Sequence, residues 1–201
     1  MTELDETAEP VDGRVARRQR NVDSVVDVVI EMFGEESLFP TIEQAATRSG
    51  LSLRSLYRYF ADPGELHQAA IRRSRVTGVE LSRLHDIGGG PFARRLEDFV
   101  GMRLRLYEAT GPVYRATVAN AAKVPALRDE LAKNRNDMRE QFELQFAPEL
   151  AACKPADRHA VIAAGDLLTQ LDSIDLLRRH RQLSVAETES VLVSSLQRLL
   201  E

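Results

Sequence analysis

Residues 41–60, TIEQAATRSGLSLRSLYRYF, constrain the fold more than any other stretch of this 201-residue chain. Thr41 followed three residues later by Gln44 is the pattern of a capping box, which predicts that a helix begins here. Gly50 offers the positive φ that a tight reversal needs, and Ser52 can then cap a second helix. Two short helices joined by a few residues that include glycine indicate a helix-turn-helix, whose second helix fits the major groove of DNA.

The second helix of this unit has two distinct faces. Arg54, Tyr57 and Arg58 stand at i, i+3 and i+4 and therefore share one side, which Leu53 also reaches. Leu56 lies on the other side and is predicted to turn inward. Guanidinium groups bind guanine edges or phosphates, and a phenol can bind a phosphate oxygen, so the outward side is suited to DNA.

This pattern, with Leu66 after it, resembles the DNA-binding domain of the TetR family of bacterial transcriptional regulators. The residues that carry the resemblance are Thr41, Ala45, Ala46, Ser49, Gly50, Leu51, Ser52, Ser55, Leu56, Tyr57, Arg58, Tyr59 and Phe60. The motif is specific from Arg17 to about Leu66, and beyond that the similarity is architectural. Two positions depart from the family: Ala45 stands where a larger apolar residue is usual, and Pro63 stands where a phosphate-contacting lysine is common.

The resemblance implies an all-α chain of about nine helices, with an N-terminal three-helix helix-turn-helix domain and a C-terminal helical bundle. It also implies a sequence-specific DNA-binding transcriptional regulator, a repressor released by a small organic ligand, that acts as a homodimer on a palindromic operator. We expect Leu53, Arg54, Tyr57 and Arg58 to face the groove of double-stranded DNA. We expect phosphate contacts from Thr41, Ser52, Ser55, Tyr59, Arg17 and Arg18.

Charge indicates an acidic tail at 1–13, and the resemblance implies a DNA-binding domain at 14–62 and a ligand-sensing and dimerisation domain at 63–201. The tail carries five acidic residues and no basic one before Arg14, so we expect it to be disordered and to point away from DNA. The arginines that follow, Arg14, Arg17, Arg18 and Arg20, reverse the charge. They suit phosphate or minor-groove contact, or they are the solvated start of a helix.

Apolar spacing predicts helices over most of the chain and indicates no strand. The first long helix is expected to end near Gly34, and its apolar stripe comprises Val22, Val25, Val26, Val29, Ile30 and Phe33. The expected long helices cover 17–33, 63–84, 92–109, 113–122, 125–146, 156–179 and 185–200, with Gly111-Pro112 ending one helix and 148–155 forming a loop. The triple glycine at 88–90 lacks the lysine and the preceding strand of a phosphate loop, so we interpret it as a hinge or loop.

The middle helices carry apolar and aromatic residues that could line a cavity for a small organic ligand. The residues concerned are Met102, Arg103, Leu106, Tyr107, Tyr114, Phe142 and Phe146. Ordinary core packing is the alternative. Arg103 is the preferred polar group, because an arginine on a mostly apolar helix could meet an anionic ligand; it could equally pair with a nearby carboxylate.

The last two helices are apolar along one side, and part of that surface could pair with a second copy of the chain in a four-helix interface. The predicted interface residues are Leu168, Leu171, Val191, Leu192, Leu196 and Leu199.

Composition limits the remaining classes of function. A net charge of −4 argues against a protein that coats nucleic acid along its whole surface, although a local basic patch is compatible with it. The single cysteine, Cys153, indicates a reducing compartment. Neither a signal peptide nor a membrane-spanning run is recognised, so we expect a cytoplasmic location and no membrane partner.

No pattern indicates catalysis, a cofactor or a metal site. Asp166, Asp172 and Asp175 lack the spacing of a calcium loop, and the four histidines are scattered. We therefore expect no cofactor, no bound metal and no enzymatic activity. The alternative function is that of a helical protein-interaction adaptor that does not bind DNA.

Overall fold

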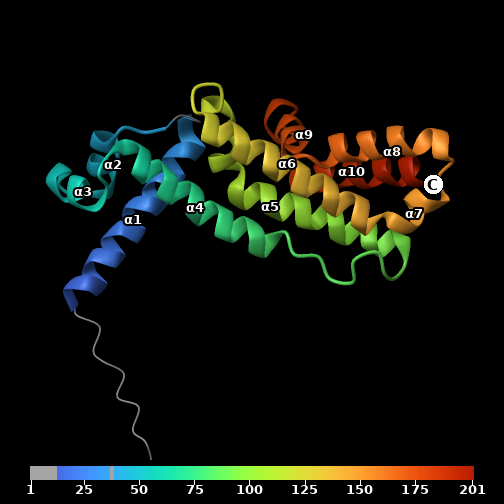
Figure 1. Ribbon diagram of the computed structural model, residues 1–201, viewed down its shortest axis with the longest axis horizontal. Helices are drawn as coiled ribbons and strands as arrows, with labels where there is room; N and C mark the ends of the chain where they lie inside the picture. The colour runs from blue at the N-terminus through green and yellow to red at the C-terminus, as the bar shows by residue number, and fades with distance from the viewer. Residues whose placement is uncertain (1–12, 37–38) are drawn as a thin grey trace, which may run out of the picture.

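The computed structural model describes residues 13–36 and 39–201, and within these ranges it is helical with no strand. The DNA-binding unit expected from sequence comprises α1 (Gly13–Glu36), α2 (Ile42–Ser49) and α3 (Leu53–Tyr59) and lies at one end of an elongated molecule (Figure 1). The long helix α4 (Pro63–Leu81) runs from this end into a helical bundle. The all-α fold predicted from the sequence is confirmed.

The N-terminal unit has its own apolar core, built from the predicted stripe of α1 and from α2 to α4. Val25, Val29 and Phe33 of α1 are fully buried, and so is Leu56 of α3. The core is completed from α5, whose Val113 and Ala116 belong to the same cluster. The bundle helix α5 (Phe92–Asn120) is thereby fastened directly to the helix-turn-helix.

Local capping positions α2 and α3 as the sequence predicts. Thr41 and Gln44 form the capping box of α2, and Gly50 ends the helix with φ = 70°. A left-handed residue at this position is tolerated by glycine without steric cost. Ser52 then caps α3 by accepting a hydrogen bond from the Ser55 backbone N–H, at 3.2 Å.

Two expected helix ends in this region were wrong. The helix α1 continues through Gly34 to Glu36, and α5 continues through Pro112 to Asn120 instead of dividing into 92–109 and 113–122. A proline inside a helix removes one hydrogen bond. Burial outweighs that loss here, because the residues after Pro112 pack into the N-terminal core.

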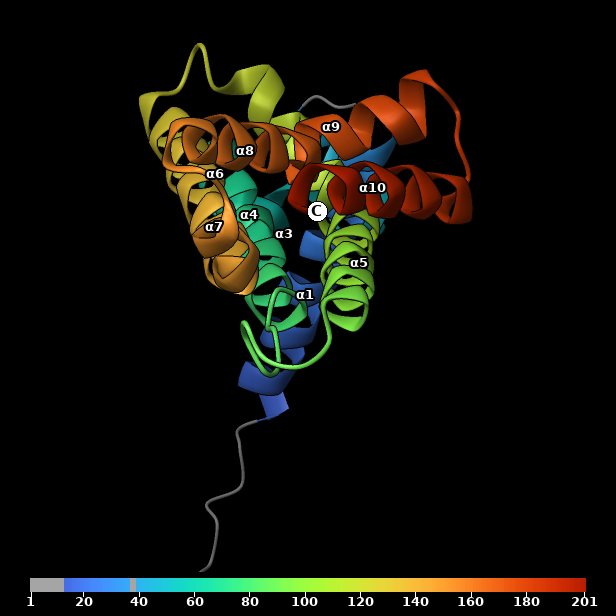
Figure 2. The same ribbon diagram turned by 90° about the vertical axis from the view of Figure 1, so that its right-hand side faces the viewer.

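The C-terminal bundle forms around α5, α6 (Pro125–Gln145), α8 (Pro155–Thr169) and α10 (Val185–Leu200). Phe99, Phe142 and Phe146 are fully buried, with ring centroids 5.1–6.2 Å apart. The helices α8 and α10 lie side by side at the end of the molecule away from α3 (Figures 1 and 2). Ser184 and Glu187 form a capping box at the start of α10.

Two further segments differ from expectation. The expected loop at 148–155 contains a short helix, α7 (Ala147–Ala152), anchored by the buried side chain of Leu150. The expected helix at 156–179 is divided into α8, α9 (Leu171–Asp175) and a π-helical turn, Leu176–His180. The division occurs at Gln170, whose backbone is extended and whose side-chain amide donates to the Arg135 carbonyl on α6 at 3.2 Å.

His67 on α4 secures the connection between α1 and α2. Its ring stacks on Phe39 at 4.5 Å between centroids, and its Nε2 lies 2.8 Å from the Pro40 carbonyl oxygen. Partial burial lowers the pKa of His67, and the Pro40 carbonyl opposes this only in part.

The pKa of His67 makes the stability of the chain depend on pH. An imidazole with a lowered folded-state pKa contributes stability that is present above the unfolded-state pKa of about 6.5 and is lost as pH falls through the folded-state value. We expect urea unfolding to show a loss of stability between about pH 7.5 and 5.5 that is smaller in His67→Phe, which keeps an aromatic ring but cannot be protonated. An identical loss in both proteins would contradict this assignment.

Within the described ranges, no helix is long and apolar enough to cross a membrane.

Candidate nucleic-acid interface and cavity

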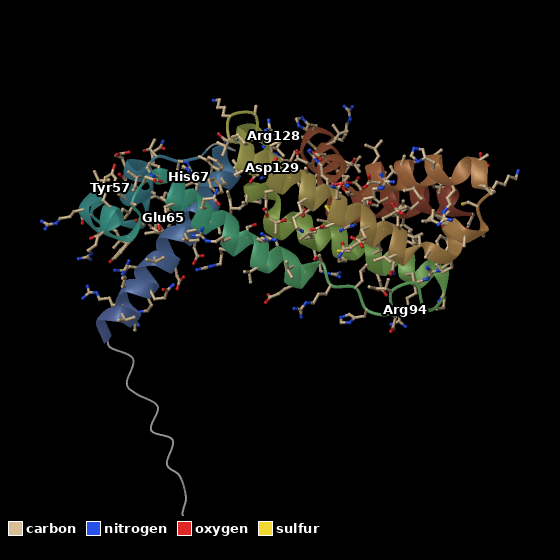
Figure 3. The ribbon with its side chains drawn as sticks, viewed as in Figure 1. Tyr57, Glu65, His67, Arg94, Arg128 and Asp129 are labelled. Atoms are coloured by element: carbon tan, nitrogen blue, oxygen red, sulfur yellow. The ribbon has the colours of Figure 1, made fainter. Side chains whose placement is uncertain are left out.

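The outward face of α3 is not covered by the other described residues. Tyr57 is 49% exposed and Leu53 39% exposed, and Arg54 and Arg58 are also exposed. Figure 3 shows Tyr57 projecting from the end of the molecule where α3 lies. The four residues predicted to face a DNA groove therefore share one accessible surface.

Three of the predicted phosphate-contacting hydroxyls, those of Thr41, Ser52 and Ser55, lie at helix starts. Thr41 Oγ1 accepts from the Gln44 N–H at the start of α2. Ser52 and Ser55 share a hydrogen bond of 2.9 Å between their Oγ atoms at the start of α3. A helix N-terminus carries partial positive charge and unpaired N–H groups, so these positions favour anions.

Tyr59 connects the recognition helix to α1. Its hydroxyl accepts hydrogen bonds from Asn21 Nδ2 at 3.1 Å and from an Arg58 guanidinium nitrogen at 3.3 Å. The Arg18 guanidinium lies 5.9 Å from the centre of its ring. The bond from Asn21, followed by that from Arg58, lowers the pKa of Tyr59.

These contacts place the basic start of α1 beside α3. Arg17, Arg18 and Arg20 are exposed there. Asn21 was missed in the sequence analysis, although it follows Arg17 by one helical turn and could have been assigned to the same side. The side chain of Arg14 and residues 1–12, including nearly all of the expected acidic tail, lie outside the described part of the chain.

A cavity of about 480 Å³ lies between α4, α5 and α6. Three of the seven predicted pocket residues line it: Arg103, Leu106 and Tyr114. Sequence reasoning missed the other α5 residues on the same face, namely Thr110, Val113 and Thr117. It also missed Ile71 and Gly78 of α4 and Leu131, Met138 and Gln141 of α6, because spacing alone does not indicate which helices will face each other.

The other four predicted pocket residues lie elsewhere. Phe142 and Phe146 fill the aromatic core, and Met102 is buried on another side of α5. Tyr107 donates a hydrogen bond of 2.8 Å to Asp175 Oδ1, and burial, more than this bond, raises its pKa to about 12. These four side chains therefore do not line the cavity between α4, α5 and α6.

Half of the predicted dimer residues lie in the interior of the single chain instead of on its surface. Leu171 on α9 and Leu192 and Leu196 on α10 are buried within the single chain. The α10 residues spaced four apart face α5 and α8, and α9 packs against the same two helices. Leu168 and Leu199 are partly buried, and Val191 is exposed. The outer surface of the pair is formed by residues such as Val191 and Leu167, which is 67% exposed.

The aspartates considered as metal ligands have other partners. Asp172 accepts a hydrogen bond from Tyr114 at 2.6 Å and pairs with Arg135 at 3.0 Å. Asp175 binds Tyr107 and pairs with Arg115 at 3.4 Å. Among the described residues, no group of three or more His, Cys, Asp or Glu side chains could hold a metal ion.

Comparison with known sequences gives a partial match. No protein-family model matches the chain. Over 87 residues it is 32% identical to the HTH-type transcriptional regulator BetI of Klebsiella pneumoniae (strain 342), and equally to that of Escherichia coli O127:H6. The match covers 42% of this chain and 43% of the length of each relative.

Solved structures match over most of the chain. A transcriptional regulator from Rhodococcus sp. Rha1 aligns with a TM-score of 0.65 and 20% identity over 91% of this chain and 95% of that one. A TetR-family regulator from Streptomyces coelicolor aligns with a TM-score of 0.63 and 21% identity, over 90% of this chain and 80% of that one. The multidrug binding protein EbrR, solved with imidazole, aligns with a TM-score of 0.59 and 19% identity, over 99% of this chain and 98% of that one. The resemblance to the TetR family is therefore confirmed for the fold.

Proposed function

We propose that this chain is a sequence-specific DNA-binding transcriptional regulator that reads the major groove through α3. The observation that carries the proposal is the accessible face formed by Leu53, Arg54, Tyr57 and Arg58. An α-helix with its side chains is about 10–12 Å across, and the major groove of B-DNA, about 12 Å wide, admits it. The similarity to regulators named as HTH-type supports the same function.

The distribution of charge supports an orientation in which α3 and the start of α1 face DNA. The chain is acidic overall, with a net charge of −4, yet the face formed by α3 and the start of α1 presents several arginines. In this proposal Arg54 and Arg58 read guanine edges or phosphates. Arg17 and Arg18 contact the backbone alongside, together with the hydroxyls of Thr41, Ser52, Ser55 and Tyr59.

We assign 14–62 to DNA binding and 63–201 to dimerisation and ligand sensing. One α3 helix reads only a few base pairs, so a homodimer on a palindromic operator is the economical arrangement. The exposed outer surface of α8 and α10, with Leu167 and Val191, is the proposed dimer surface.

The cavity supports regulation by a small organic ligand, since its volume of about 480 Å³ lies in the usual range for such sites. Its wall includes α4, whose other end lies next to α3. A ligand that prefers one position of α4 would change the spacing of two recognition helices and release a repressor. Reducing operator occupancy from 99% to 1% requires about 5.5 kcal/mol of differential binding.

Removing one base-contacting group tests the assignment of α3. We expect Arg54→Ala to reduce the preference for the operator over random DNA by about 1–3 kcal/mol, because a guanidinium paired with a guanine edge is lost. Arg94→Ala is the matched control, since it removes the same charge at the opposite end of the molecule (Figure 3). The measurement is competition binding by fluorescence anisotropy with purified full-length protein.

The same assay distinguishes the alternative function. A protein that contacts phosphates binds duplexes with an affinity that falls steeply as salt increases. A helical protein-interaction adaptor would bind no duplex at any salt concentration. Unchanged specificity in Arg54→Ala would mean that another helix reads the DNA.

A further inference from the structure

Arg103 is a fully buried cation at the wall of the cavity, with 0% of its surface exposed. The ion pairs among the described residues include none with Arg103. Its guanidinium lies 4.7 Å from the centre of the Phe99 ring and donates to Gln141 Oε1 at 2.8 Å and to the Met138 carbonyl at 2.7 Å. The sequence left open whether Arg103 meets a ligand or pairs with a carboxylate of the chain. Among the described residues, Arg103 forms no ion pair with a carboxylate.

The guanidinium is also incompletely hydrogen-bonded. An arginine has five N–H donors, and Arg103 Nε is buried without an acceptor. Burial lowers the pKa of Arg103 to about 9, and the more distant carboxylate of Asp166 offsets this only in part. At neutral pH the side chain is therefore charged, and a buried charge without a counter-ion is unfavourable.

The other charged groups at the cavity neutralise one another to a large extent. Arg75 pairs with Glu130 at 3.5 Å, and Lys133 pairs with Asp137 at 2.6 Å. Glu140 is exposed. Inside, the hydroxyls of Thr110 and Thr117 each donate to a carbonyl of their own helix, at 2.7 Å. The deep part of the cavity thus combines apolar surface with one unneutralised positive charge.

We propose that the cavity binds an organic monoanion, with a carboxylate on Arg103 and an apolar body along Leu106, Val113 and Leu131. A carboxylate can accept two parallel hydrogen bonds from a guanidinium, and such charge-assisted hydrogen bonds are stronger than neutral ones. The proposed anion site is argued from the residues of the cavity alone. Its effect on DNA binding rests on the proposed function.

Gln141 connects this site to α4. Its Oε1 accepts from Arg103, and its Nε2 donates at 2.9 Å to the carbonyl of Ser82, the residue that caps the C-terminal end of α4. Because Arg103 has no exposed surface, an incoming carboxylate replaces the Gln141 oxygen. The hydrogen bond that holds the end of α4 is then broken or redirected, so anion binding reaches the helix that carries α3.

The test compares three probes of equal chain length: octanoate, n-octanol and n-octylamine. The affinities are measured by isothermal titration calorimetry of the full-length protein near neutral pH. We expect octanoate to bind at least about 10-fold more tightly than octanol, and octylamine to bind more weakly than octanol. Arg103→Met is expected to weaken octanoate about 10- to 100-fold and octanol less than about 3-fold.

A second variant keeps the test valid if Arg103→Met folds poorly. Gln141→Glu places a carboxylate beside Arg103 and is expected to exclude octanoate by internal pairing, while circular dichroism shows an intact helical protein. Equal affinity for the three probes, no octanoate binding at millimolar concentration, or unchanged octanoate affinity in the folded variants would overturn the proposal.

DNA binding is measured separately. Octanoate binding without any duplex binding would refute the proposed function and leave the anion site intact. Duplex binding without octanoate binding would refute the anion site and leave the proposed function intact.

Discussion

Replacing Gly165 by alanine is expected to lower the free energy of unfolding by about 3 kcal/mol, near the upper end of the usual cost of overpacking a core. A Cβ atom at this position of α8 would lie 2.6 Å from Cε1 and Cε2 of Phe142 and closer still to Cζ. Phe142 is fully buried between Phe99 and Phe146 and cannot move aside. The strain exceeds the gain of about 1 kcal/mol in helix propensity from glycine to alanine.

Gly101→Ala provides the matched control for this experiment. Gly101 is also inside a helix, but its added Cβ would meet only the flexible end of Arg105, at 3.2 Å. We expect Gly101→Ala to be neutral or up to about 1 kcal/mol more stable. Urea denaturation of both variants measures the difference, and a Gly165→Ala protein as stable as the unsubstituted chain would contradict the close packing of α8 on α6.

The second large effect is expected at the buried ion pair between Arg95 and Glu149. Their side chains are only 7% and 15% exposed, and Arg95 also donates to the carbonyls of Gln145 and Gly90. Glu149→Ala leaves the guanidinium buried without its counter-ion, which costs about 3–5 kcal/mol of stability. Thermal and urea unfolding should both detect it.

A neighbouring exposed pair shows how much of this loss is due to burial. Arg94 and Asp98 lie 3.7 Å apart with side chains 81% and 68% exposed. Asp98→Ala is expected to cost less than about 0.5 kcal/mol, because water and salt screen exposed pairs. Equal losses in Asp98→Ala and Glu149→Ala would show that the Arg95 pair is not buried as described.

Local signals explain what the sequence could predict. The starts of α2, α3 and α10 follow from side chains three residues apart that cap their own helix, and the turn at Gly50 follows from one residue type. The exposed and buried faces of α3 follow from the α-helical period of about 3.6 residues. None of these depends on a distant part of the chain.

Contacts between distant segments explain the features that could not be predicted from the sequence. Pro112 lies inside a helix because the residues after it are buried against α1 to α4, and the chain breaks at Gln170, which binds a carbonyl of α6. Apolar spacing identified Phe142 and Leu192 as important but could not indicate that both face the core of one chain. Arg103 was identified for its charge in an apolar setting, while its partner Gln141 has no comparable signal in the sequence.

Selection of bound sequences from a random DNA pool by the full-length protein tests whether α3 reads DNA. We expect enrichment of one palindromic sequence whose half-sites are centred about one helical turn, or a multiple of it, apart, and loss of that enrichment in Arg54→Ala. A pool that remains random after repeated selection, or one enriched equally by both proteins, would contradict the reading of DNA by α3.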